Sequence, residues 1–100
     1  MKIIVTKRAN RDFLRIQNYL FDQWGNSSVI KFKDRVNDFL DILEIFPEIG
    51  SIEVPEKSIR GFQLNSHIRI FYTVENDSLV IHSFFNVLQN SDKKNLRNKN

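Results

Sequence analysis

The chain has 100 residues, which is enough for one domain with a single hydrophobic core but too few for two. Hydrophobic residues make up 41% and charged residues 27%, a balance typical of globular rather than disordered proteins. The sequence lacks an apolar run near the ~20 residues of a membrane span, a signal-peptide core and cysteine, so we expect a cytoplasmic protein without disulfides or thiolate metal sites.

The charges are sorted along the chain, although the formal net charge is only +3. Bases dominate residues 1–20, 57–71 and 91–100, whereas residues 34–56 hold seven acidic residues and one base, Arg35. A chain polarised in this way presents a basic surface that would attract a polyanion or an acidic protein. Ordinary solvated surface charge is the alternative explanation.

The first elements are a predicted strand and a predicted helix. Residues 2–6, KIIVT, form a β-branched run typical of a short strand. From about Lys7 the apolar side chains recur at spacings of four and three residues, as on one face of a helix, and Trp24 with Gly25 closes the pattern. These helical positions are Ala9, Phe13, Ile16 and Leu20.

A second helix is predicted directly after this glycine. Residues 26–28, NSS, offer N-cap side chains, apolar positions follow at three- and four-residue spacing, and Pro47 ends the pattern. The apolar positions are Val29, Phe32, Val36, Phe39, Leu40, Leu43 and Phe46. Two long amphipathic helices with so short a connection must run antiparallel and pack against each other.

After a loop predicted at residues 47–57, the apolar period changes to two, and short turns separate three strands of an antiparallel meander. These strands are predicted near 58–64, 67–74 and 79–87. The expected fold is α+β, with a helical hairpin on one face of a small, mainly antiparallel four-stranded sheet. Residues 1–90 would form this single domain, and residues 91–100 a basic, flexible tail.

The turn lengths predict a register, which assigns the side chains of the meander to two faces. A two-residue NS loop places Phe62 across from Arg69, and a four-residue ENDS loop places Arg69 across from Phe84. The face expected to receive the helices carries Ile68, Ile70, Tyr72, Val74, Leu79, Ile81 and Phe85. The other face carries Arg60, Phe62, His67, Arg69, Phe71, His82 and Phe84.

This second face mixes bases with aromatic rings, as surfaces that bind nucleic acid do. A second small core, with arginine paired to a loop acid, would explain the same residues. The three glycines stand apart, so no glycine-rich phosphate loop is present. The two histidines lie fifteen residues apart without cysteine. We therefore expect neither a cofactor nor a metal.

Several motifs follow one another in a characteristic order. They are KRANRDFLRIQNYL followed by WG, a long second helix ending in FPEIG, then IRGFQLN, HIRIFYTVENDSLVIHSFFN and a basic tail. From Lys2 to about Asp92 the chain thereby resembles the RelE/ParE superfamily of bacterial type II toxins. The resemblance implies the α+β fold expected above. It also implies a growth-inhibiting toxin, often linked to plasmid stabilization, that a cognate antitoxin encoded beside it holds inactive.

The superfamily divides by target. RelE-like members bind and cut messenger RNA in the ribosomal A site without a metal, using basic residues on the sheet and a proton shuttle. ParE-like members are thought to act on DNA gyrase and are not enzymes. Arg60 and Arg69 match arginines of the RelE-like pattern, but Leu88 stands where a third arginine belongs. No tyrosine or histidine follows Asn90.

The WG junction and the long hairpin favour the ParE-like branch, so we expect a toxin that acts on replication by binding protein. Two alternatives stay open, a RelE-like endoribonuclease and a non-toxic binding module of the same fold. The candidate catalytic residues are Arg60, Arg69 and His82, the last as a proton donor or acceptor. The candidate target-binding residues are His67, Phe84, Lys93, Lys94 and Arg97. The antitoxin-binding residues stay unassigned.

Overall fold

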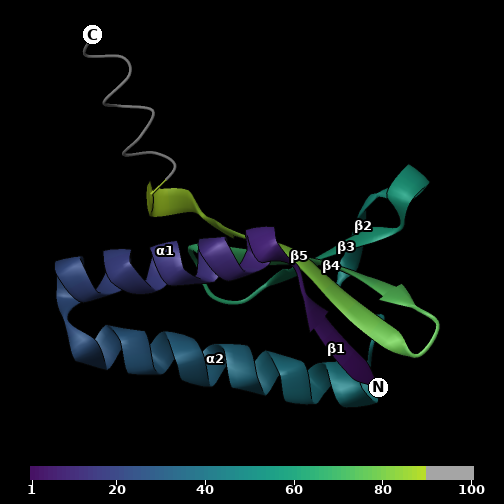
Figure 1. Cartoon of the computed structure of the whole chain (residues 1–100), viewed down its shortest axis with the longest axis horizontal. Coiled ribbons are helices and arrows are strands. Elements are labelled where there is room, and N and C mark those ends of the chain that lie inside the picture. The colour runs from purple at the N-terminus through teal and green to yellow at the C-terminus, as the bar shows by residue number, and fades with distance from the viewer. Residues whose placement is uncertain (90–100) are drawn as a thin grey trace, which may run out of the picture.

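The computed structural model describes residues 1–89 of the chain. The elements in chain order are β1 (Lys2–Val5), α1 (Lys7–Trp24), α2 (Asn26–Ile45), β2 (Ser51–Val54), a short 3-10 helix (Pro55–Lys57), β3 (Ile59–Gln63), β4 (Ile68–Glu75) and β5 (Ser78–Asn86). Figure 1 shows the helices α1 and α2 as an antiparallel hairpin. The strands form a twisted sheet at the end of the hairpin opposite its turn. None of the helices within residues 1–89 has the length and apolar character that crossing a bilayer requires.

Within residues 1–89 the sheet has five strands in the order β1-β5-β4-β3-β2. Among these five described strands only β1 and β5 pair in parallel, and the other neighbours are antiparallel, which confirms the α+β class. The prediction of four strands missed β2, which lies inside the segment expected to be a loop. Ser51–Val54 do alternate polar and apolar residues, but this edge strand has only four residues before Pro55, and so short a run is a weak signal.

The helical hairpin begins and turns as predicted, although its second cap differs. Thr6 caps α1, because its hydroxyl accepts a 3.0 Å hydrogen bond from the Ala9 amide. Gly25 ends α1 at a positive φ of 83°, and α2 starts at the next residue. The expected N-cap in residues 26–28 is wrong. Ser28 instead lies in the first turn and donates to the carbonyls of Leu20 and Gly25.

The hydrophobic core fills the space between the hairpin and the sheet. Its centre is aromatic, since the Phe39 ring lies 4.6 Å from the Phe62 ring and 5.7 Å from the Tyr72 ring, measured between centroids. The buried members of the core are Ala9, Ile16, Phe32, Val36, Phe39, Leu43, Leu64, Ile68, Ile70, Tyr72, Leu79, Ile81 and Phe84. The helical spacing therefore identified most of the core on the hairpin.

The register between β3 and β4 differs from the prediction by one residue. Gln63, not Phe62, pairs with Arg69, and Phe62 pairs with Ile70. The loop is longer than two residues because the Asn65 side chain accepts hydrogen bonds from the amides of His67 and Ile68. Phe62 consequently turns from the predicted second face into the core.

The register between β4 and β5 is correct near the turn and then shifts. Thr73 pairs with Val80 as predicted, but Tyr72 pairs with Ile81 and Phe71 with Ser83, which leaves His82 as the extra residue of a bulge. Two contacts from outside the sheet stabilise the bulge. The Phe84 amide donates to the Asp12 carboxylate (3.1 Å), and the Thr6 hydroxyl donates to the His82 carbonyl (3.1 Å).

The bulge exchanges the two phenylalanines that follow it. Phe84 points into the core against the rings of Phe13 and Phe32, whereas Phe85 is 40% exposed on the opposite face. The prediction of Phe85 in the core and Phe84 on the second face is therefore wrong. We call the face of the sheet opposite the helices the open face. From the observed register it carries Ser51, Gly61, Gln63, Arg69, Phe71, Ser83 and Phe85.

Candidate functional site

Arg60 lies on the helix side of the sheet, because it pairs across the strands with the buried Tyr72. Its guanidinium donates to the carbonyls of Glu48 (3.0 Å) and Gly50 (2.7 Å) and lies 3.8 Å from the Glu48 carboxylate. The side chain is only 20% exposed. The hydrogen bonds of the Arg60 guanidinium thus go to the loop that follows α2.

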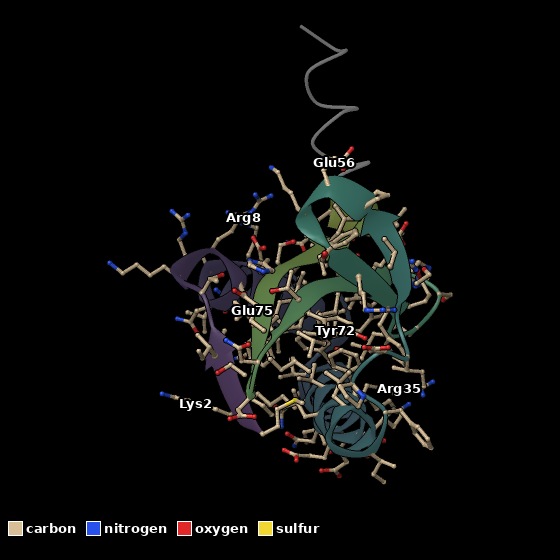
Figure 2. All side chains as sticks on the ribbon, turned by 90° about the vertical axis from the view of Figure 1, so that its right-hand side faces the viewer. Lys2, Arg8, Arg35, Glu56, Tyr72 and Glu75 are labelled. Carbon is tan, nitrogen blue, oxygen red and sulfur yellow. The ribbon has the colours of Figure 1, made fainter. Side chains whose placement is uncertain are left out.

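Tyr72 holds the same loop from the centre of the sheet, where Figure 2 labels it. Its hydroxyl donates to the Pro47 carbonyl (3.0 Å) and accepts from the Gly50 amide (2.8 Å). Burial raises the pKa of the Tyr72 phenol above its ordinary value, and the carboxylate of Glu48 acts in the same direction. The Gly50 hydrogen bond and the positive charge of Arg60 lower this pKa and only partly offset the burial.

Arg69 lies on the open face, with its side chain 28% exposed. Its guanidinium passes over Gly61 and forms an ion pair with Glu53 on β2. It also donates to the Gln63 side chain (2.9 Å) and to the Ser51 hydroxyl (3.3 Å). The alternative of an ion pair with an acid from the loop region, raised from the sequence, is what the structure shows.

His82 is the bulge residue and is joined to two polar neighbours. Its Nε2 lies 2.9 Å from the Thr73 hydroxyl, and that hydroxyl donates to the Glu75 carboxylate at 2.9 Å. Since the hydroxyl has only one proton, His82 Nε2 is the donor in this chain. Arg69 lies farther along the sheet, where its cross-strand neighbour is Phe85. Arg69 and His82 therefore have separate partners.

The remaining candidates lie at several places. His67 is exposed in the β3–β4 loop, with Nδ1 3.2 Å from the Ser66 hydroxyl. Phe84 is buried, so it offers no ring for stacking. The basic residues Lys93, Lys94 and Arg97 fall outside the described residues, as does the predicted tail. The predicted site residues within 1–89 are therefore not gathered at one site.

Two hollows combine a few residues named from the sequence with others that the sequence did not single out. One, of about 240 Å³, lies where α1 meets β5, and Arg8 and Arg15 line it together with Phe71 and Phe85. Figure 2 shows Arg8 on this flank of the molecule. The two arginines are seven residues apart, and this helical spacing was a signal that could have linked them.

The other hollow is an apolar groove of about 620 Å³ with a basic rim. Leu20 and Trp24 of α1, Phe32 of α2, and Ile68 and Leu88 of the sheet region contribute apolar lining. Basic side chains also line it, namely Lys31, Arg35 and His67. We call it the basic-rimmed groove. Within residues 1–89, no cluster of three or more acidic or histidine side chains is placed to hold a metal ion.

The described residues thus form a small α+β scaffold with one arginine-lined hollow and one apolar groove with a basic rim. The sequence matches the family of ParE toxins of type II toxin-antitoxin systems, parDE, over residues 3–92. Because this match covers most of the chain, the protein belongs to the ParE toxin family. No curated protein sequence is significantly similar to the chain.

Solved structures share the fold at low sequence identity. The chromosomal ParDE toxin-antitoxin system from P. aeruginosa has a chain with TM-score 0.63 and 18% identity, covering 87% of this chain and 96% of that chain. The YoeB/ParE toxin from Agrobacterium tumefaciens has a TM-score of 0.62 and 13% identity, and the match covers 86% of this chain and 98% of that chain. A copper-bound mutant toxin from Helicobacter pylori has a TM-score of 0.61 and 15% identity, and the match covers 89% of this chain and 97% of that chain.

Proposed function

We propose that this chain stops growth as a ParE-like toxin, by binding a protein of DNA replication, with DNA gyrase as the target. One observation carries the proposal. Arg60 and Arg69, which match the RelE-like endonuclease pattern, lie on opposite sides of the sheet. Cations that stabilise the charge on one scissile phosphate have to face it together. Arg60 and Arg69 do not, which favours a toxin that acts by binding.

The contacts of these two arginines support the same conclusion. Arg60 is tied to two backbone carbonyls, and Arg69 to Glu53 and two further side chains. Freeing either one for a phosphate would break a charge-assisted interaction inside the protein. Leu88 takes the place of the third arginine and lines the basic-rimmed groove instead.

We further propose that the basic-rimmed groove receives the cognate antitoxin. The groove offers apolar side chains for a partner's apolar residues, and Lys31 and Arg35 for its acids. A segment with apolar anchors and acidic flanks would thus be complementary in both respects. The residues of the groove come from α1, α2 and the sheet, so one segment lying in it would contact the whole scaffold.

A RelE-like endoribonuclease is the second candidate, and the hollow between α1 and β5 gives it specific support. Arg8 and Arg15 lie beside the rings of Phe71 and Phe85, a combination that suits phosphate and stacked bases. His82 would then supply or accept the proton. In this version Arg60 takes no part, and the arginines of α1 lie beside Phe85, the cross-strand partner of Arg69.

Pulse labelling after induced expression separates these candidates. We expect thymidine incorporation to fail before amino-acid incorporation, and the variants Arg69→Gln and His82→Gln to inhibit growth within about two-fold of the wild type. Arg11→Gln serves as a control for loss of one exposed positive charge. Amino-acid incorporation that fails first, with inhibition abolished by Arg69→Gln, would establish the endoribonuclease. A wild-type protein without effect on growth would identify a non-toxic binding module.

A further inference from the structure

Large apolar side chains are exposed where α2 ends. Ile45 and Phe46 are 70% and 61% exposed, the highest values among large hydrophobic residues within 1–89, and Ile49 is 47% exposed. With Pro47 and Glu48 these three line a hollow of about 560 Å³. We call Ile45, Phe46 and Ile49 the Phe46 patch. Contiguous exposed apolar groups of this kind are typical of interaction surfaces.

The loop that carries the patch is fixed by the rest of the protein. Arg60 and Tyr72 bind the carbonyls of Pro47, Glu48 and Gly50 and the amide of Gly50. The Phe46 amide also donates to Ile42, and the Ile49 amide to Phe46. The side chains of the patch are therefore held outward by a restrained backbone. A preorganised surface loses less conformational entropy on binding than a mobile one.

The charged residues near the patch indicate which charge a partner should carry. Residues 36–56 contain no lysine or arginine, and Asp41, Glu44, Glu48 and Glu53 surround the patch in sequence. The Glu48 side chain is 75% exposed at the hollow itself. Glu44 and Glu48 lie 3.8 Å from the N-terminal amine and from Arg60, and Glu53 pairs with Arg69. Glu48 is nevertheless the charged side chain that lines the hollow, so its sign is opposite to that of the Lys31 and Arg35 rim of the basic-rimmed groove. Two surfaces of opposite charge suit two different partners.

We propose that the Phe46 patch is the surface that binds the target protein, and that it receives an apolar segment flanked by lysine or arginine. The inference rests on the proposed function, since it takes the target to be a protein. It assigns Arg60 a positioning role, because the guanidinium holds the loop from beneath while the patch makes the contact.

The test compares the wild type with Phe46→Ser/Ile49→Ser and with a matched control on α1, Leu14→Ser/Phe21→Ser. The control residues are similarly exposed, at 47% and 56%. Thermal unfolding checks that both variants fold. We expect the patch variant to bind immobilised gyrase holoenzyme at least ten-fold more weakly and to lose growth inhibition, while the control keeps both within about two-fold. Binding by the wild type should also weaken as salt rises.

Other outcomes overturn the inference. A patch variant that still inhibits growth excludes the patch as the target surface. If that variant also escapes neutralisation by the co-expressed neighbouring antitoxin, the patch belongs to the antitoxin. If light scattering instead shows a wild-type dimer that the variant lacks, the occupant is a second copy. A wild type that leaves growth unaffected overturns both proposals.

The proposed function can fail separately. If the wild type does not bind gyrase and amino-acid incorporation stops first, gyrase is not the target. In that case the growth assay still tests whether the patch is the surface that binds the target. Loss of inhibition in the patch variant alone supports the surface for another protein target, and equal loss in the α1 control overturns it.

Discussion

The hydroxyl of Tyr72 accepts a 2.8 Å hydrogen bond from the amide of Gly50, which lies 22 residues earlier in the chain. The same hydroxyl donates to Pro47, so the central strand of the sheet fixes the loop that follows α2. Gly50 can approach this closely only because it lacks a Cβ. The Tyr72 hydroxyl therefore holds this loop together with the Arg60 guanidinium.

Replacing Tyr72 by phenylalanine keeps the ring and removes the hydroxyl. The Gly50 amide and the Pro47 carbonyl both lose this partner. We expect the free energy of unfolding to fall by about 1–3 kcal/mol, the usual cost of leaving buried polar groups unpaired. Urea unfolding measures it, and an unchanged m value would show that the loss is one of stability alone. A loss below about 0.5 kcal/mol would contradict the role of the hydroxyl.

Tyr72 also predicts how stability depends on alkaline pH. Burial raises its pKa in the folded state above the ordinary 10.0, so the folded protein keeps the phenolic proton where the unfolded chain releases it. The resulting stabilisation is complete below pH 10 and declines as the pH rises through the folded pKa. The comparison is with Tyr72→Phe, which removes the phenol and leaves the other groups of the protein unchanged. The difference in unfolding free energy between the two proteins should shrink above pH 10, and a constant difference would contradict the prediction.

Gly50 and Gly61 predict unequal costs for the same substitution. A Cβ at Gly50 would lie 2.8 Å from the Gly61 carbonyl oxygen, which is backbone and cannot move aside. A Cβ at Gly61 would meet only the side chains of Glu53 and Arg69. We expect Gly50→Ala to cost about 1–3 kcal/mol as overpacking. Gly61→Ala should cost less than about 1 kcal/mol, the range of an exposed ion pair. Thermal unfolding of the two variants tests the order, and equal losses would be inconsistent with it.

The bulge at His82 predicts different effects at two adjacent phenylalanines. Phe84 packs against Phe13 and Phe32, so Phe84→Ala should cost about 3–5 kcal/mol. Phe85 is 40% exposed on the open face, and Phe85→Ala should cost less than about 1.5 kcal/mol. Chemical denaturation of both variants decides between this register and one without the bulge, for which the order would be reversed.

The sequence predicted the parts of the fold that depend on local periodicity. The helical spacing gave the hairpin, with Gly25 at its turn and its end just before Pro47. Period-two alternation gave β3, β4 and β5 to within one or two residues. The parallel pairing of β1 depends on contacts between distant segments, and no local pattern encodes it.

The candidate site was less predictable, because faces depend on register. The Asn65 side chain lengthens one loop and Asp12 stabilises a bulge, and each moves side chains across the sheet. Arg60 and Arg69 appeared to share a face under the predicted turns, but the observed register separates them. The resemblance identified the family, which the match over residues 3–92 confirms. The roles of individual residues stay predictions.

The parallel pairing of β1 with β5 also orders the formation of the fold in time. The hairpin can form from neighbouring segments, whereas Lys2 finds its partner only at Ser78. During synthesis the first strand made must wait until nearly the whole sheet has left the ribosome. A chain cut short before Ser78 would retain the hairpin but leave β1 without its partner strand. The scaffold beneath the basic-rimmed groove and the Phe46 patch is thus completed by β5, the last strand of residues 1–89.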